Sequence, residues 1–153
     1  MKTVNEKAEA FRRLHERTET WVIANPWDAG SARVLAHAGF EALATSSAAS
    51  AGTLGRLDYN VKREEALEMA RRIVEAVDVP VSADLENGFG DTPEEVAETV
   101  RRAAEIGLAG CSIEDARGDA EPYEFGLACE RIEAAVESAR SVGRPFVLTA
   151  RSE

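Results

Sequence analysis

The sequence predicts an α/β protein, specifically the first part of a (β/α)₈ TIM-type barrel that is truncated after about five strands. Short apolar runs alternate with amphipathic segments at a spacing of roughly 35 residues, which is typical of right-handed βαβ units and a parallel sheet. Every apolar run also becomes polar where it ends. Barrels carry functional groups at the ends of all their strands, whereas a doubly wound sheet concentrates them at one point. A complete barrel takes about 250 residues, and this chain has 153.

The elements follow in a regular order. An N-terminal helix within residues 1–18 has an apolar stripe of Val4, Ala8, Phe11 and Leu14. The predicted strands are Trp21–Asn25, Ala42–Ser47, Val79–Glu86, Gly110–Asp115 and Phe146–Glu153. The predicted helices are Ser31–Ala38, Arg63–Ala76, Pro93–Ile106 and Phe125–Val142. Thr92 to Glu95 form a capping box, and glycines 39, 107 and 143 each end a helix. No linker interrupts this pattern, so we expect residues 1–153 to belong to a single domain.

Composition restricts the partners. With 44% hydrophobic and 30% charged residues, the chain has the make-up of a soluble globular protein. A net charge of -10 disfavours nucleic acid and anionic membranes as partners. The charged N-terminus does not resemble a signal peptide, and no run approaches the roughly 18 apolar residues of a membrane span. The two cysteines lack zinc-site spacing, and we expect a reduced, cytoplasmic setting in which Cys111 only packs.

Three acidic residues are the strongest functional signal. Asp84 and Glu86 are two residues apart at the end of a predicted strand, and alternate residues of a strand point to the same side. Glu114 ends the next strand, and neighbouring strands lie roughly 4.8 Å apart. Converging carboxylates need a counter-charge, and oxygen ligands suit Mg²⁺, with Mn²⁺ as the alternative. The competing interpretation is that these are solvated loop acids.

Other polar residues near the strand ends suit a small anionic substrate. Arg151 lies on the same face as Thr149 and could bind a substrate carboxylate bidentately, or else pair with one of the acids. The small, donor-rich segment 45–53 could hold carboxylate or phosphonate oxygens, or could be a flexible polar loop. Asp58 is interpreted either as an indirect support of the metal site or as a turn residue.

Four motifs resemble those of the isocitrate lyase/phosphoenolpyruvate mutase superfamily, in the same order: Asn25–Arg33, Asp84–Gly90, Ile113–Asp115 and Leu148–Arg151. The resemblance implies a barrel with Mg²⁺ at its mouth, held directly by Asp84 and through waters by Glu86 and Glu114. It implies that the segment Thr45, Ser46 and Ser47 binds the 2-oxo acid end of the substrate and that Arg151 binds a substrate carboxylate. It also places Asp58 beside the substrate and metal, so we assign catalytic roles to Asp58 and Arg151.

The resemblance implies a Mg²⁺-dependent lyase that cleaves or forms a C–C bond in a small 2-oxo or 2-hydroxy carboxylic acid through an enolate. The loop Asp115–Tyr123 lacks the Lys-Cys-Gly-His-type sequence of isocitrate and methylisocitrate lyases, so isocitrate lyase activity is not expected. One alternative is a P–C bond phosphonomutase or phosphonopyruvate hydrolase, and another is a non-catalytic fragment. The predicted partner is a small carboxylate or phosphonate, and the parent protein is expected to be a homo-oligomer.

Overall fold

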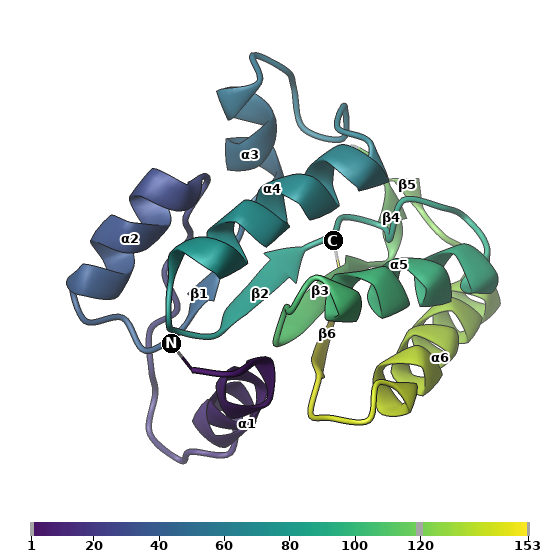
Figure 1. Ribbon diagram of the computed structural model, residues 1–153. Coiled ribbons are helices and arrows are strands. Elements are labelled where there is room, and N and C mark those ends of the chain that lie inside the picture. The colour runs from purple at the N-terminus through teal and green to yellow at the C-terminus, as the bar shows by residue number, and fades with distance from the viewer. Residues whose placement is uncertain (1, 119–120, 153) are drawn as a thin grey trace.

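The computed structural model describes residues 2–118 and 121–152 (Figure 1). The helices are α1 (Val4–His15), α2 (Ala29–His37), α3 (Ser47–Thr53), α4 (Arg63–Ala76), α5 (Pro93–Glu105) and α6 (Phe125–Ser141). The strands are β1 (Leu43–Ala44), β2 (Val81–Asp84), β3 (Gly110–Glu114), β4 (Ala116–Arg117), β5 (Glu121–Pro122) and β6 (Val147–Arg151). Small parts of the predictions lie outside the described residues. These are Met1 and Glu153 at the two ends of the predicted domain, and positions 119–120 of the loop before Tyr123.

The main sheet has four parallel strands in the order β1-β2-β3-β6. Each strand therefore pairs with the next main-sheet strand along the chain, and the order never reverses. A doubly wound sheet reverses its strand order at a switch point, whereas a barrel does not. The topology confirms the predicted α/β fold with a parallel sheet, and closure into a complete barrel stays a prediction. A separate antiparallel pair, β4 with β5, follows β3 and was not predicted.

The prediction of a strand over Trp21–Asn25 is wrong. Only Ala24 takes part in pairing, as an isolated parallel bridge to Leu43, with the Ala44 amide donating to the Ala24 carbonyl at 3.0 Å. The segment lies at the edge of the sheet, with Val22 68% exposed, and Pro26 has no N–H group with which to extend the ladder. One backbone contact is therefore all that remains of the predicted strand.

The two faces of the sheet differ in polarity. Val81, Ala83, Cys111 and Ile113 point outward and are buried with α2, α4, α5 and α6 in the main hydrophobic core. Burial raises the pKa of the Cys111 thiol to about 12, so this cysteine is an inert packing residue, as predicted. The other face carries the serines, threonine and charged groups of the same strands. The candidate site residues therefore lie on the face opposite the main hydrophobic core.

Helix α1 packs across the amino ends of the strands, at the lower end of the sheet in Figure 1. The predicted stripe is confirmed for Ala8, Phe11 and Leu14, which are buried, while Val4 is 41% exposed. Phe11 and Leu14 contact Ala42 and Ala109, with Trp21, Ile23 and Val147 packed around them. This small second core leaves the opposite end of the sheet, near α3 and the β4–β5 pair, for function (Figure 1).

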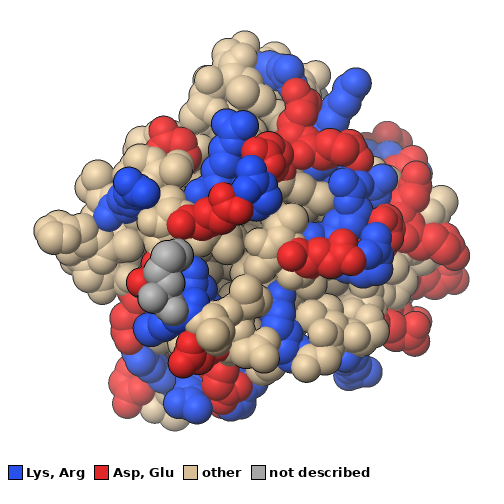
Figure 2. Space-filling view, viewed as in Figure 1, with Lys and Arg blue, Asp and Glu red and all other residues tan. Residues whose placement is uncertain are grey.

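Local signals account for the helix ends. The capping box of Thr92 with Glu95 is present, and Pro93 is the first residue of α5. Asp28 and Ser31 form a second capping box at the start of α2. Figure 2 shows arginine and acidic side chains mixed over the face that α4 and α5 form, where they make ion pairs within each helix. Within the described ranges, no helix is both long enough and apolar enough to cross a membrane.

Candidate functional site

The site begins where β2, β3 and β6 end side by side. Asp84 is paired in register with Ser112, and Glu114 with Arg151. The Arg151 Nη1 atom lies 2.8 Å from Glu114 Oε1 and 3.7 Å from Asp84 Oδ2. The structure thus brings two of the three predicted metal-binding acids together with the predicted substrate-binding arginine, on the face of the sheet opposite the main hydrophobic core. Their ligand roles stay predictions.

Backbone amides orient the Asp84 carboxylate. Oδ2 accepts a hydrogen bond from the Ser47 amide at 3.1 Å, and Oδ1 accepts one from the Glu86 amide at 3.2 Å. The Asp84 amide in turn donates to Thr45 Oγ1 at 3.1 Å. The side chain is 12% exposed. A carboxylate held this way keeps a fixed direction, while its remaining lone pairs stay available for a further ligand.

Glu86 reaches the site by a different route from the one predicted. Strand β2 ends at Asp84, and Glu86 has a left-handed backbone with φ of 51°. The alternation of strand residues therefore does not explain why both acids meet. A turn places Glu86 instead, and the Glu114 amide donates to the Glu86 carbonyl at 2.9 Å.

The Glu86 carboxyl group is strongly perturbed. The residue is 4% exposed. Burial, followed by repulsion from Asp58, Asp84 and Glu114, raises its pKa to about 7. Burial disfavours the ionised form of this carboxyl group and the three neighbouring acids add repulsion, so this environment favours a proton or a cation at Glu86.

This pKa predicts a specific pH dependence of stability. Between pH 4.5, the ordinary pKa, and about 7, the folded protein keeps a proton on Glu86 that the unfolded chain has released. The free energy of unfolding must therefore fall as the pH rises through that window, by at most about 3 kcal/mol. Urea unfolding at pH 5 and pH 8, in the presence of EDTA, measures this change. Glu86→Gln has no such proton, so the free energy of unfolding of this variant is expected to differ little between the two pH values. If the variant keeps the pH dependence of the wild type, Glu86 is not its cause.

The segment between α3 and α4 supplies two further groups. The Tyr59 Oη atom donates to Glu114 Oε2 at 2.8 Å, and Asp58 lies close enough to Glu86 to raise its pKa. Glu114, whose side chain is 1% exposed, is thus held by Tyr59 on one side and Arg151 on the other. Sequence reasoning missed Tyr59, because its partner lies 55 residues away and no local pattern marks a tyrosine that binds it.

The segment 45–53 is not the loop that the sequence predicted. Residues Ser47–Thr53 form α3, and the Ser46 hydroxyl caps it by accepting from the Ala49 amide at 3.3 Å. Serine is a strong N-cap residue, and the alanines that follow it favour a helix. Thr45 and Ser47 still lie beside Asp84, whereas the Ser46 side chain serves the helix. The flexible-loop alternative is therefore wrong, and substrate binding by Thr45, Ser46 and Ser47 stays a prediction.

The residues present fit a hydrated Mg²⁺ ion better than a fully enclosed one. Among the side chains that the structure describes, no three acids, histidines or cysteines are placed to form a complete ligand group. Mg²⁺ keeps several waters and is commonly held by only one or two carboxylates. Carboxylate oxygens are the donors that it prefers, and the acids around Glu86 are of this kind. Direct binding by Asp84 and indirect binding by Glu86 and Glu114 stay predictions.

Fold and site together define a class of protein. A parallel α/β sheet whose strand order never reverses, with acids and an arginine gathered at the carboxyl ends of its strands, is the arrangement of barrel-type enzymes. The sequence profile of the family described as phosphoenolpyruvate phosphomutase matches residues 11–153. The chain belongs to this family of enzymes, which confirms the resemblance to the isocitrate lyase/phosphoenolpyruvate mutase superfamily.

Individual relatives agree with this assignment. The 2-methylisocitrate lyase of Halalkalibacterium halodurans is 29% identical over 160 residues, which cover 99% of this chain and 52% of that protein. A solved structure from Burkholderia cenocepacia J2315, described in general terms as a lyase/mutase, is 54% identical with a TM-score of 0.96, covering 98% of this chain and 55% of that one. The structure of 2,3-dimethylmalate lyase is 30% identical with a TM-score of 0.87, covering 100% of this chain and 54% of that one. The chain spans about half the length of these relatives.

Proposed function

We propose that this chain is part of a Mg²⁺-dependent enzyme that cleaves or forms a C–C bond in a small 2-oxo or 2-hydroxy carboxylic acid. The observation that carries the proposal is the meeting of Asp84, Glu114 and Arg151 at three adjacent strand ends, with the buried Glu86 beside them. The names of the relatives, 2-methylisocitrate lyase and 2,3-dimethylmalate lyase, support C–C bond chemistry on carboxylic acids.

Each residue has a proposed role that follows from its chemistry. Asp84 would hold Mg²⁺ directly, and Glu86 and Glu114 would hold waters of its shell. When bound, Mg²⁺ would supply Lewis-acid stabilisation for the negative charge that develops at the 2-oxo group during the reaction. The Arg151 guanidinium already contacts Glu114 at 2.8 Å, and its side chain is 45% exposed. An arginine fork that is exposed in this way can also bind a substrate carboxylate.

The remaining roles concern the substrate and its surroundings. We propose that Thr45, Ser46 and Ser47 bind the 2-oxo acid end of the substrate and that Asp58 acts beside the reacting atoms. Tyr59 joins this set, because its hydroxyl fixes Glu114. Glu114 therefore has one partner from the segment between α3 and α4 and one from β6, and it connects the two sides of the site.

A second candidate is P–C bond chemistry, as in a phosphonomutase or phosphonopyruvate hydrolase. The specific observation in its favour is the match to the phosphoenolpyruvate phosphomutase family. The Asp115–Tyr123 loop carries neither cysteine nor histidine, and it also lacks the lysine and asparagine of the mutase type, so it favours neither candidate. The Lys-Cys-Gly-His-type loop of isocitrate and methylisocitrate lyases is thus missing from this chain.

Parallel NMR assays distinguish the candidates. The protein is incubated with Mg²⁺ and either a panel of small 2-hydroxy and 2-oxo dicarboxylic acids or phosphonopyruvate, with and without excess EDTA. The first proposal expects proton signals of a smaller 2-oxo acid that appear only when Mg²⁺ is present, with an unchanged phosphorus spectrum. A new phosphorus resonance would instead establish the second candidate. Silence in both assays from a folded protein would favour the third interpretation, a non-catalytic fragment.

A further inference from the structure

The turn that follows β2 has an unusual backbone. Glu86 and Phe89 have φ of 51° and 57°, and Gly88 has φ of 85°. The left-handed region costs a non-glycine residue roughly 1–2 kcal/mol. Two such residues within four positions persist only when the surrounding structure holds them. The turn therefore needs external contacts, and it is also the segment that carries Glu86 into the site.

Two outer helices supply those contacts. From α6, Arg131 Nη1 donates to the Gly90 carbonyl at 2.6 Å, and Nη2 donates to the Asn87 carbonyl. From α5, Thr99 Oγ1 donates to the Gly88 carbonyl at 2.6 Å. Three carbonyl groups of a single turn thus accept hydrogen bonds from side chains that are more than ten residues away in sequence. Because a fixed guanidinium fork binds two carbonyls at once, Arg131 sets the distance between them.

Arg131 is itself held firmly. It is 1% exposed, and its Cζ atom lies 3.8 Å from the ring centre of Tyr123. The Tyr123 hydroxyl donates to Asp91 Oδ1 at 2.7 Å and accepts from Asn87 Nδ2 at 2.8 Å. Asp91 also pairs with Arg117 of the β4–β5 hairpin. Arg131 and Tyr123 therefore bind the start and the end of the turn and connect it to the hairpin.

We propose that Arg131 is a positioning residue for Glu86. By holding the Asn87 and Gly90 carbonyls, it keeps Glu86 in its left-handed conformation and directs the Glu86 carboxylate toward Asp84 and Glu114. Loss of the arginine relaxes the turn, and the carboxylate moves away from the other acids. The consequence for metal binding rests on the proposed function of the site, whereas the effect on the turn is independent of it.

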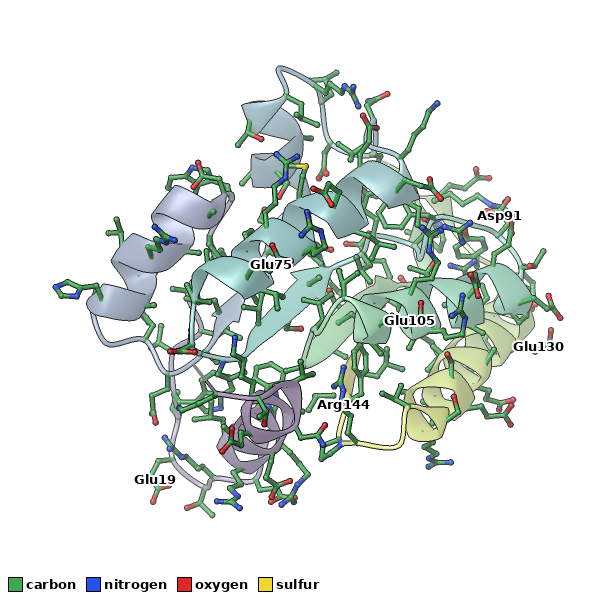
Figure 3. All side chains as sticks on the ribbon, in the orientation of Figure 1. Glu19, Glu75, Asp91, Glu105, Glu130 and Arg144 are labelled. Atoms are coloured by element: carbon green, nitrogen blue, oxygen red, sulfur yellow. The ribbon has the colours of Figure 1, made fainter. Side chains whose placement is uncertain are left out.

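The chain offers a matched control for this role. Arg144 also binds backbone carbonyls, those of Ala104 at 2.7 Å, Leu108 at 3.0 Å and Pro145 at 3.2 Å, and lies over the ring of Phe146. Figure 3 labels Arg144 in the lower middle of the molecule and Asp91 at the upper right. Arg131→Met and Arg144→Met therefore remove the same kind of contact, one beside the proposed metal site and the other remote from it.

The first measurement is Mn²⁺ binding by isothermal titration calorimetry. Arg131→Met is expected to weaken Mn²⁺ affinity by about 10–100-fold, which is typical for residues that orient metal ligands. Arg144→Met is expected to lose stability but to keep its affinity. Arg131→Lys, which retains one donor and the charge, is expected to fall between the wild type and Arg131→Met. Equal Mn²⁺ affinity in the wild type and both Arg131 variants would overturn the inference. The proposed function would still stand in that case if Asp84→Ala shows no Mn²⁺ binding.

The second measurement is amide hydrogen exchange of the metal-free protein. The Glu114 amide donates to Glu86 and the Gly88 amide donates to Leu85, so both should exchange faster in Arg131→Met. The Ala109 amide, which donates to Val81 at the far end of β2, should be unchanged. If Asp84→Ala binds Mn²⁺ like the wild type, the proposed metal site is rejected. The role of Arg131 in the turn is then tested by hydrogen exchange alone. Uniform acceleration of all three amides would reduce Arg131 to a general stabilising residue, and Arg131→Lys provides the same comparison if Arg131→Met does not fold.

Discussion

Asp84→Ala is expected to abolish the coupled binding of Mg²⁺ and oxalate, with a loss of affinity of more than about 100-fold. Asp84 is the last residue of β2, which lies between β1 and β3, and hydrogen bonds from the Ser47 and Glu86 amides orient its carboxylate. Among the proposed ligands, only Asp84 is expected to contact the ion directly, so no other side chain replaces it. Oxalate is a suitable probe, because it is a planar dianion that resembles the enolate of a 2-oxo acid. Calorimetric titration of Mg²⁺ with and without oxalate measures the coupling.

Two controls separate metal binding from a general effect on folding. Asp84→Asn keeps the shape of the side chain and one of its two acceptor oxygens, so it is expected to fold with a modest loss of stability, yet to lose the ion, because it lacks the negative charge. Asp78→Ala removes an exposed acid whose partner is the Lys2 amide, at the other end of the sheet, and should bind Mg²⁺ and oxalate like the wild type. Coupled binding that persists in both Asp84 variants would reject the proposed site.

Gly110→Ala is expected to destabilise the protein by about 2–4 kcal/mol, at the upper end of the cost of forcing an extra carbon into a packed site. A Cβ atom on Gly110 would lie 2.4 Å from the Val147 carbonyl oxygen and 3.0 Å from Cε1 of Phe11. The first contact is with backbone, which cannot move aside without separating β3 from β6. The substitution therefore acts on the strand pair whose other end holds Glu114 beside Arg151.

Gly52→Ala is the matched control, because a Cβ atom there would have no neighbour within 4 Å. Alanine favours a helix over glycine, so this change in α3 is expected to be neutral or to stabilise by up to about 1 kcal/mol. Urea unfolding followed by circular dichroism compares the two variants. Equal stability of both would mean that β3 and β6 do not pair in this register, and the Glu114–Arg151 contact would then lose its structural basis.

Local signals predicted much of the fold. The bounds of α4, Arg63–Ala76, agree with the prediction, and α5 begins at the predicted Pro93. Both helices have a regular apolar stripe and acidic residues in the first turn, and Gly107 follows the end of α5, all of which are properties of consecutive residues. Helix α3 was missed because its serines, alanines and glycine carry no apolar stripe. The strand predicted at Trp21 was wrong because an apolar run does not reveal whether a pairing partner lies beside it.

The candidate site, like the fold, was predicted only in part from the sequence. Asp84, Glu114 and Arg151 were identified correctly as neighbours, because parallel strands place their carboxyl ends at one edge. Glu86 was placed in the right location for the wrong reason, since it follows the strand in a left-handed turn. Tyr59 and Arg131 were not found at all. Their partners lie 55 and 41 to 44 residues away, and a tyrosine or arginine alone does not indicate what it will contact.

The sequence by itself determined five of the six described helices, the cap of α5, the parallel strands and the family, because these depend on periodicity, turn residues and motifs that are read along the chain. Only the tertiary structure decided how the acids are arranged: that Arg151 spans Asp84 and Glu114, that Tyr59 holds Glu114, and that Arg131 fixes the turn of Glu86. The physical reason is that burial and hydrogen bonding between distant segments set the direction and charge of each carboxyl group, and neither is a property of neighbouring residues.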